Sequence, residues 1–340
     1  MGNYSSIGID LGGTKTRTTL FDHKFRVLET VKFKTEPGRG ISRFERRLNE
    51  ALKTLLRKAK SGELAVPVLG IGCAGRIDSK AMQVRDSLNV PFLKEYPMGA
   101  KLAKLTGAQV FIGNDVHMGL YGEHQLGAAI GLQHVIGVFL GTGIGGALIM
   151  NGKLFLGAGG YAGDIGHYLV QPLGPLGGSE RQGVLDDFAS RTAIAAAAAA
   201  FAAKQWAPEL LKMAGTDLAN IRTSVLAQSI KKGDKQIEEL VRSRARIIGI
   251  VLSNMVDFIN PEMVVIGGGL VEEMPGLILK EVEAGIREHS TAAALENQKV
   301  ATVKLGDQAV TAGAAKMAWD LFVKNETSGQ PPSKAVLKIK

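Results

Sequence analysis

Three glycine-rich turns, each placed directly after a short apolar run, are the parts of this sequence best suited to chemistry. They are Asp-Leu-Gly-Gly-Thr-Lys at 10–15, Gly-Thr-Gly-Ile-Gly-Gly at 141–146 and Gly-Gly-Gly at 267–269. Glycines allow backbone N–H groups to approach a phosphate closely, and Thr14 and Lys15 can add further donors. The second turn has no Walker lysine and is not a P-loop. One such turn is equally well explained as a hairpin that needs positive φ, but three in one chain predict phosphate contacts.

The pair Asn114-Asp115 is the second candidate for chemistry, because it ends an apolar run and precedes an expected helix. Taken alone, the pair is explained by a turn and a helix N-cap. Phosphoryl transfer, however, needs a group that accepts the proton of the attacking hydroxyl. Beside phosphate-binding turns, Asp115 becomes a candidate general base.

These residues must be positioned by strands, since each follows apolar or β-branched residues. We expect strands at 6–9, 16–21, 25–34, 68–73, 110–112, 135–140, 147–150, 154–156, 263–266 and 299–304. We expect helices at about 41–60, 97–107, 118–126 and 309–323, and a helical region from about 185 to 258 that includes the alanine-rich segment 193–203. A strand–turn–strand unit occurs twice, around 10–14 and around 141–146, which indicates a weak internal duplication.

Length and composition limit the class of protein. A chain of 340 residues favours two domains, and 45% hydrophobic with 21% charged residues is ordinary for a globular protein. The single cysteine, Cys73, excludes an internal disulfide and a cysteine zinc site, and we expect a cytoplasmic protein with no signal peptide or membrane span. The net charge of +9 permits a polyanionic partner. We attribute it to a solvated helix face at 43–60 and a basic tail at 334–340, and expect neither nucleic acid nor membrane as a partner.

The order and spacing of the three turns resemble the actin-like ATPase (ribonuclease H-like) fold, an α/β fold with two related domains and a nucleotide cleft between them. The resemblance implies ATP and Mg²⁺ as cofactors, with Asp10 holding Mg²⁺ through water. The residues that it assigns to the phosphates are Gly12, Gly13, Thr14, Lys15, Gly141, Thr142 and Gly143, and those that it assigns to adenosine are Gly267, Gly268 and Gly269. We expect a small α/β domain at 1–115, completed by a helix at about 306–323, a large α/β domain at 116–305, and a disordered tail at 325–340.

The segments GAGGYAGDIGHYLVQPLGP at 157–175 and GVLDDFASRTAIA at 183–195, with GTGIGGALIMNGKLFLG before them, closely resemble the ROK family of sugar kinases and repressors. The resemblance covers about residues 5–320. It implies phosphorylation of a hexose, glucose or a related sugar, most often at the 6-position, and it favours a homodimer. It makes Asp115 the catalytic base, and it implies sugar contacts by Asn89, Asn114, Asp115, Asp164, His167 and Asp186.

Two departures from the family pattern change what the resemblance implies. Most members carry a structural zinc on three cysteines, whose positions fall here on Gly177, Ser179 and Val184. These side chains are poor zinc ligands or none, and we expect no structural zinc. Asp164 and Asp186 replace the family's usual glutamates, so each carboxylate is set back by about 1.5 Å, the length of one carbon–carbon bond. The choice of sugar therefore cannot be carried over from the family.

Two alternatives stay open. The first is a sugar kinase that uses polyphosphate in place of ATP, which the basic charge permits. The second is a non-catalytic sugar sensor, since the family includes repressors. Those repressors carry a DNA-binding region before the first phosphate strand, for which a strand beginning by residue 7 leaves no room.

Overall fold

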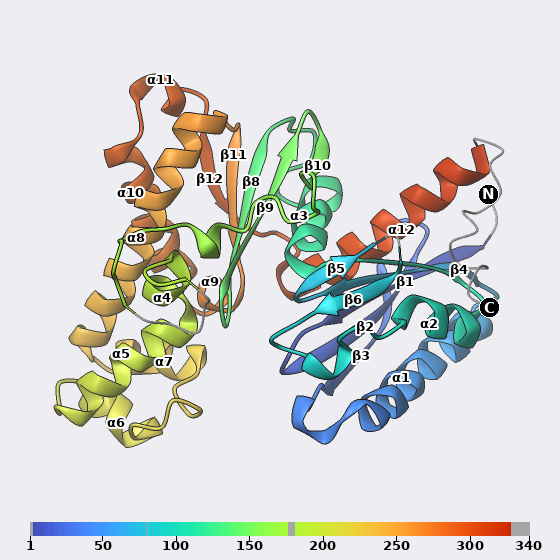
Figure 1. The fold of residues 1–340 in the computed structure, drawn as a ribbon, viewed down its shortest axis with the longest axis horizontal. Coiled ribbons are helices and arrows are strands. Elements are labelled where there is room, and N and C mark those ends of the chain that lie inside the picture. The colour runs from blue at the N-terminus through green and yellow to red at the C-terminus, as the bar shows by residue number, and fades with distance from the viewer. Residues whose placement is uncertain (1–2, 80, 176–180, 328–340) are drawn as a thin grey trace. The chain divides into compact units, whose positions relative to one another are not determined.

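The computed structural model of the chain describes residues 3–79, 81–175 and 181–327, which form two compact units. The first unit comprises Met1–Gly131 and Asp307–Lys340, and the second comprises Leu132–Gly306 (Figure 1).

The first unit contains a five-stranded sheet in the order β3-β2-β1-β4-β7. Three antiparallel strands are followed by two strands parallel to β1. The strands are β1 (Tyr4–Leu11), β2 (Lys15–Asp22), β3 (Val27–Lys34), β4 (Ala65–Cys73) and β7 (Gln109–Asn114). A small second sheet, formed by β5 (Arg76–Asp78) and β6 (Gln83–Asp86), was not expected from the sequence.

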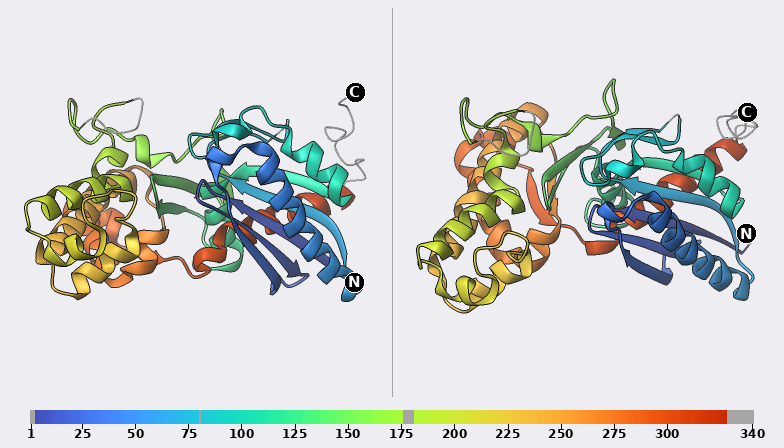
Figure 2. Two further views of the ribbon diagram at one scale, coloured as in Figure 1. Left: turned by 90° about the horizontal axis from the view of Figure 1, so that it is seen from below. Right: turned by 60° about the horizontal axis from the view of Figure 1, so that its bottom comes forward.

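Helices cover both faces of the first sheet (Figures 1 and 2). The helices are α1 (Ile41–Ser61) and α2 (Met98–Thr106) on one face, and α12 (Ala309–Thr327) and α3 (Asp115–Leu126) on the other. Ile9 and Leu11 join the apolar core with α1, whereas the alternate residue Gly8 faces α12. A Cβ at Gly8 would lie 1.9 Å from the carbonyl oxygen of Thr311, so only glycine lets α12 approach this closely.

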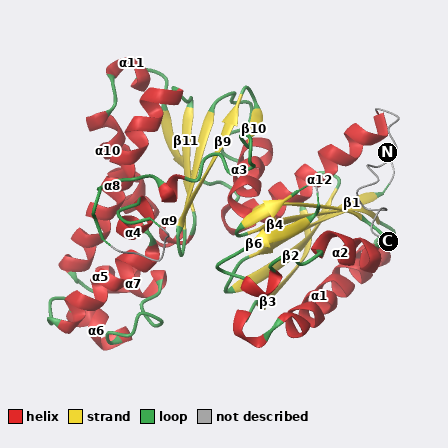
Figure 3. Cartoon of the chain, in the orientation of Figure 1, coloured by secondary structure: helices red, strands yellow, loops and turns green. Residues whose placement is uncertain are grey.

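The second unit repeats this strand order as β10-β9-β8-β11-β12. Its strands are β8 (Val135–Leu140), β9 (Ile144–Met150), β10 (Lys153–Phe155), β11 (Met263–Gly267) and β12 (Lys299–Thr302). Its helices are α4 (Leu185–Ala189), α5 (Arg191–Ala203), α6 (Pro208–Ala214), α7 (Thr223–Lys231), α8 (Lys235–Ile259), α9 (Gly269–Glu273), α10 (Pro275–His289) and α11 (Ala292–Leu295). Residues 185–259 are almost wholly helical (Figure 3), and their apolar side chains form one core with β8 and β11.

The structure confirms the α/β class and the duplicated strand–turn–strand unit, and it corrects three boundaries. The helix expected at 118–126 begins at Asp115, because Asn114 caps it. The first unit runs to Gly131 rather than to residue 115, since α3 packs closely against α12: a Cβ at Gly122 would lie 2.5 Å from the carbonyl oxygen of Ala309. Residues 325–327, expected to be disordered, continue α12, and the rest of that tail lies outside the described residues. Among the described helices, none has both the length and the apolar character needed to cross a bilayer.

Candidate active site

The carboxyl ends of neighbouring strands bring Asp10 and Asp115 to the same edge of the first sheet. In the parallel registers Asp10 pairs with Gly72, and Gly72 pairs with Gly113, which lies two residues before Asp115. A Cβ at Gly72 would lie 3.3 Å from Cα of Asp115 and 2.5 Å from Cγ1 of Val310. The two acidic candidates therefore flank a glycine that the sequence analysis did not single out. The signal that could have identified Gly72 is a glycine within an apolar strand, which often marks a place where another segment approaches closely.

Asn114 fixes the start of α3. Its side-chain oxygen accepts hydrogen bonds from the backbone N–H groups of Val116 (2.9 Å) and His117 (3.2 Å), and its amide donates to the carbonyl of Gly75 (3.3 Å). Asp115 lies in the first turn, where Oδ1 accepts from the N–H of Val116 at 3.0 Å. The N-cap explanation of this pair is thus correct for Asn114, and it leaves Asp115 as the carboxylate beside Asp10.

Burial raises the pKa of both carboxylates. The pKa of Asp115 rises to about 6, although the hydrogen bond from the N–H of Val116 lowers it in part. The pKa of Asp10 rises to about 7 through burial and the charge of Asp115, opposed by the guanidinium of Arg17. A carboxylate with a raised pKa is a stronger proton acceptor and is still largely ionised near neutral pH in the case of Asp115.

The first glycine turn is held from both sides. The N–H of Gly12 donates to the carbonyl of Lys15 at 3.1 Å, and the hydroxyl of Thr35 donates to the carbonyl of Gly12 at 2.6 Å. A Cβ at Gly13 would lie 2.9 Å from both Cβ and the carbonyl oxygen of Asn89. The structure therefore places Asn89, a predicted sugar contact, directly against the predicted phosphate turn. Thr35 was missed, since nothing in its local sequence marks it.

The second glycine turn belongs to the second unit and is held by Asp186. The N–H of Gly141 donates to the carbonyl of Gly143 at 2.9 Å, and the N–H of Ile144 donates to Oδ1 of Asp186 at 2.5 Å. The hydroxyl of Thr192 in α5 donates to the carbonyl of Thr142 at 2.9 Å. A Cβ at Gly143 would lie 2.9 Å from Oδ2 of Asp186. A predicted sugar contact again lies against a predicted phosphate turn.

Asp164, His167 and Asp186, three of the predicted sugar contacts, lie near one another in the second unit. Oδ2 of Asp164 lies 3.8 Å from Nε2 of His167. Gly166 connects this pair to Asp186, since a Cβ there would lie 3.0 Å from Oδ1 of Asp186. Burial raises the pKa of Asp186, while the N–H of Ile144 and the nearby His167 lower it.

The third glycine turn leaves backbone accessible at the end of β11. Gly268 has a φ of 91° and caps α9, and a Cβ there would lie 2.6 Å from the carbonyl oxygen of Leu140. At Gly269 the nearest atom to a Cβ would be the hydroxyl oxygen of Thr223, 3.9 Å away. Only Gly269 has room beside its backbone, because Gly267 and Gly268 are packed against Val303 and Leu140.

The metal expectations can be tested on the donor atoms. The carboxylate of Asp10 accepts no hydrogen bond from the described residues, so it is free to bind the water shell of Mg²⁺. No group of three or more His, Cys, Asp or Glu side chains within the described ranges could hold a metal directly. Of the three zinc-motif positions, Gly177 and Ser179 lie outside the described residues, and Val184 is a buried apolar side chain.

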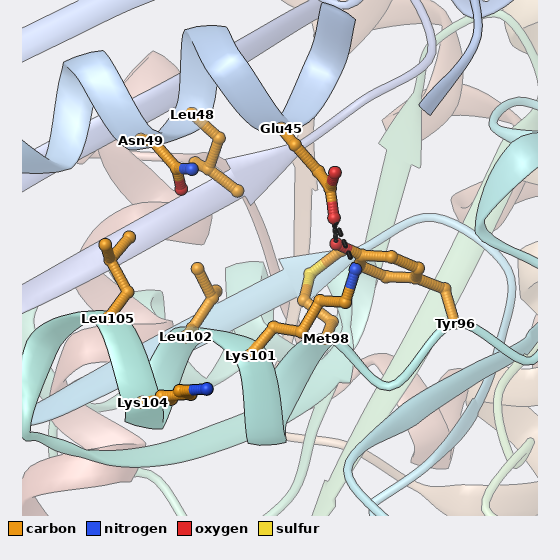
Figure 4. Close-up of a pocket in the computed structure, with 9 residues that line it drawn as sticks. All are labelled: Glu45, Leu48, Asn49, Tyr96, Met98, Lys101, Leu102, Lys104 and Leu105. Carbon is orange, nitrogen blue, oxygen red and sulfur yellow. Dashed lines mark hydrogen bonds and ion pairs between the residues drawn. The ribbon is translucent and has the colours of Figure 1, made fainter. Parts of the chain in front are cut away.

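A cavity of about 380 Å³ lies elsewhere in the first unit, between α1 and α2 (Figure 4). The Tyr96 hydroxyl and the Lys101 ammonium both donate to Oε1 of Glu45, the latter at 2.6 Å. The ammonium also lies 4.6 Å from the centre of the Tyr96 ring. None of the predicted site residues lines this cavity.

Known proteins match this architecture over almost its whole length. A glucokinase from Thermotoga maritima is 34% identical over 265 residues, which cover 78% of this chain and 81% of that protein. A glucokinase from Streptomyces coelicolor is 28% identical over 316 residues, covering 92% and 97%. The crystal structure of a ROK family glucokinase from Streptomyces griseus, in complex with glucose and AMPPNP, has a TM-score of 0.80 and 29% identity, and covers 93% of this chain and 99% of that one. The fold and the site thus define a sugar kinase with the actin-like ATPase fold.

The family follows from the sequence as a whole. The model of the ROK family matches residues 6–320, and the chain belongs to the ROK family.

Proposed function

We propose that this sugar kinase transfers the γ-phosphoryl group of ATP to a hydroxyl of a hexose, with Asp115 as the general base. The observation that carries the proposal is the placement of Asp115 beside Asp10 across Gly72, with a pKa raised to about 6. ATP as the donor is supported by the Streptomyces griseus glucokinase, whose structure contains AMPPNP, an ATP analogue.

In the proposed mechanism, the hydroxyl oxygen forms a bond to the γ-phosphorus as the bond from that phosphorus to the bridging oxygen breaks. The hydroxyl proton passes to Asp115, and ADP leaves. In the turns at 12–15 and 141–143, the backbone N–H groups other than those of Gly12 and Gly141 hold the phosphates, and the turn at 267–269 contacts adenosine. Asp10 would hold Mg²⁺ through water, and the ion would neutralise charge on the phosphates.

We assign the sugar hydroxyls to side chains that lie beside the two phosphate turns. Asn89 and Asn114 come from the first unit, and the second unit contributes Asp164, His167 and Asp186. Support comes from the contacts of Asn89 with Gly13 and of Asp186 with Gly143. The substrate is glucose or a related hexose, phosphorylated at the 6-position. We also propose that the enzyme works as a homodimer in the cytoplasm, where ATP is available.

A non-catalytic sensor is less well supported, because a kinase-inactive protein needs neither the base nor its pairing with Asp10. Polyphosphate as a donor is favoured by one observation, the positive charge of Lys15, Arg17, Lys32 and Lys34 beside the first turn.

The proposal is tested by measuring ADP release with MgATP and a panel of glucose, mannose, fructose, N-acetylglucosamine, N-acetylmannosamine and allose. We expect strong turnover with one sugar. Absence of turnover with every sugar would overturn ATP as the donor. The same panel with polyphosphate would then separate a polyphosphate-dependent kinase, which turns over, from a sensor, which binds a sugar without turnover.

A further inference from the structure

Four cationic side chains share one face of strands β2 and β3, next to the first glycine turn. In the antiparallel register Lys15 pairs with Lys34, and Arg17 pairs with Lys32. Directly paired residues, and residues two apart along a strand, project from the same face of a sheet. The four Cα atoms therefore mark a rectangle of roughly 5 by 7 Å, the spacing between strands and between alternate residues. We call Lys15, Arg17, Lys32 and Lys34 the basic face.

The side of the sheet on which the basic face lies follows from its neighbours. Phe33, between Lys32 and Lys34, packs toward α1, where its ring centre is 6.1 Å from that of Phe44. The basic face points the other way, since Arg17 and Lys32 both form ion pairs with Asp307, directly before α12. The face thus begins at the glycine turn and continues outward to the edge strand.

Most of this positive charge is not neutralised by the protein. Like charges placed directly opposite each other destabilise a sheet. Asp307 forms ion pairs with both Arg17 and Lys32, and its Oδ2 atom lies 3.3 Å from Nζ of Lys32. Within residues 3–79, 81–175 and 181–327, no carboxylate lies within 4.0 Å of the ammonium of Lys15 or Lys34. Glu36, close by in sequence, is already bound to Arg43 (2.9 Å) and Arg47 (2.5 Å).

Arg17 has unused hydrogen-bond donors. Its Nε and Nη1 atoms are buried and have no hydrogen-bond partner among the described residues. A buried donor without a partner costs free energy that a ligand oxygen can recover. Arginine also suits phosphate, because its planar guanidinium donates to two oxygens at once.

Protection of the sheet edge explains only part of this arrangement. Lysines on an edge strand prevent pairing with another sheet, which accounts for Lys32 and Lys34 on β3. It does not account for Lys15 and Arg17, which lie on β2, inside the sheet. An open hollow of about 500 Å³ lies between β3 and α1, and the charged residues in its lining are Lys32, Lys34, Arg47 and Glu50.

We propose that the basic face binds a chain of inorganic polyphosphate, one end of which lies at the first glycine turn. The proposal rests on the proposed function, because it extends the phosphate side of the same site. The glycine turns are proposed to bind the three phosphates of ATP. Lys32 and Lys34 are therefore available to bind the additional phosphates of a longer chain. Nucleic acid fits less well, since the four positions carry no aromatic side chain on which a base could stack.

The test is direct binding of polyphosphate to the full-length protein at near-physiological salt, with the double variant Lys32→Glu/Lys34→Glu. Its matched control, Lys53→Glu/Lys60→Glu, makes the same change in net charge at exposed positions of α1. We expect the face variant to weaken binding at least about tenfold and to reduce its salt dependence, as loss of phosphate contacts does. We expect the control to change affinity less than about twofold, since charges beyond roughly 8–10 Å are screened. Equal losses in both variants would mean that net charge alone attracts the polymer, and would overturn the proposal.

Three further measurements and a second variant complete the test. Polyphosphate must compete with ATP in the wild-type protein, because both occupy the first turn, and non-competitive behaviour would overturn the proposal. A single-stranded DNA oligonucleotide that binds as tightly, through the same lysines, would assign the face to nucleic acid instead. ADP release with a sugar is measured on the same samples, so that failure of the kinase proposal is seen separately. Lys32→Gln/Lys34→Gln keeps the test valid if charge reversal prevents folding, because it removes the like-charge repulsion.

Discussion

The two five-stranded sheets have the same strand order but different side chains at equivalent positions. Residues 7–12 read Ile-Gly-Ile-Asp-Leu-Gly, and residues 136–141 read Ile-Gly-Val-Phe-Leu-Gly. Asp10 pairs with Gly72 in the first sheet, and Phe139 pairs with Gly267 in the matching register of the second. An apolar ring therefore stands where the first sheet has a carboxylate.

This difference indicates a division of labour on a duplicated scaffold. The first sheet gathers the half-buried carboxylates of Asp10 and Asp115, which are proposed to bind the water shell of Mg²⁺ and to act as the general base. The second sheet holds a glycine turn through Asp186, close to Asp164 and His167, which are proposed to select the sugar. The scaffold alone does not determine which copy performs chemistry, because both copies keep the glycine turn. The acidic residues make the distinction.

The largest effect is expected from Asp115→Asn, which removes the proposed base and keeps its shape. Turnover should fall by about 10²- to 10⁴-fold, the usual contribution of general base catalysis, while the dissociation constant for the sugar changes little. The fall should be similar for every sugar, because the base acts on the hydroxyl whichever sugar carries it. Steady-state kinetics and a sugar-binding assay measure the two quantities.

The control for this variant is Glu239→Gln, the same carboxylate-to-amide change at an exposed position of α8. It should leave turnover unchanged. Activity of Asp115→Asn within about tenfold of wild type would show that Asp115, at the edge of the first sheet, is not the general base.

The next effect concerns stability, because even partial burial of a carboxylate destabilises its charged form. The pKa of Asp115 is about 6 in the folded protein and about 3.9 when unfolded. The folded state therefore holds its proton more tightly, and stability is lost as pH rises from about 4 to about 6. Asp115→Asn should be more stable than wild type at pH 8, by up to about 3 kcal/mol, and the gain should vanish near pH 4.

Thermal unfolding midpoints of the two proteins at both pH values measure this effect. A gain at pH 8 that persists unchanged at pH 4 would show that better packing, and not removal of a buried charge, stabilises the variant.

A matched pair of glycine substitutions compares the two sheets directly. A Cβ at Gly72 would lie 2.5 Å from Cγ1 of Val310, and one at Gly267 would lie 2.5 Å from Cγ1 of Val303. Gly72→Ala and Gly267→Ala should each lower stability by about 1–3 kcal/mol, the cost of overpacking. Only Gly72→Ala should also lower kcat, by about tenfold or more, because it displaces Asp115. Gly267→Ala should instead raise the KM for ATP, and equal losses of kcat would contradict the division of labour.

Much of the fold could be predicted from the sequence, because apolar periodicity and glycine turns are local signals. The hairpin at Asn151-Gly152 was anticipated, and both residues have positive φ, at 52° and 68°. The pairing of Asn89 with Gly13 could be anticipated only through the family resemblance, since 76 positions separate them in the sequence.

What could not be predicted depends on contacts between distant segments. The requirement for glycine at Gly72 arises from Val310, which is far away in sequence. The sequence analysis attributed the net charge to residues 43–60 and 334–340, and only the register brings Lys15, Arg17, Lys32 and Lys34 together on β2 and β3. Strand register and helix packing are set by the whole fold, so no local pattern reveals them.

The smallest effect, and the one that tests the second unit, is expected from Asp186→Glu. The added methylene moves the carboxylate forward by about 1.5 Å, which forces it out of its bond with the N–H of Ile144 and toward the proposed sugar site. The ratio of kcat/KM values between two hexoses should change by about tenfold, because a pocket distinguishes substrates by the polar groups that it leaves unpaired. Asp187→Glu is the matched control, the same change at the next residue, and should leave the ratio unchanged. Asp115→Asn should lower turnover with every sugar by a similar factor, whereas Asp186→Glu should change the order of preference among sugars. An unchanged order would contradict the proposal that the second unit selects the sugar.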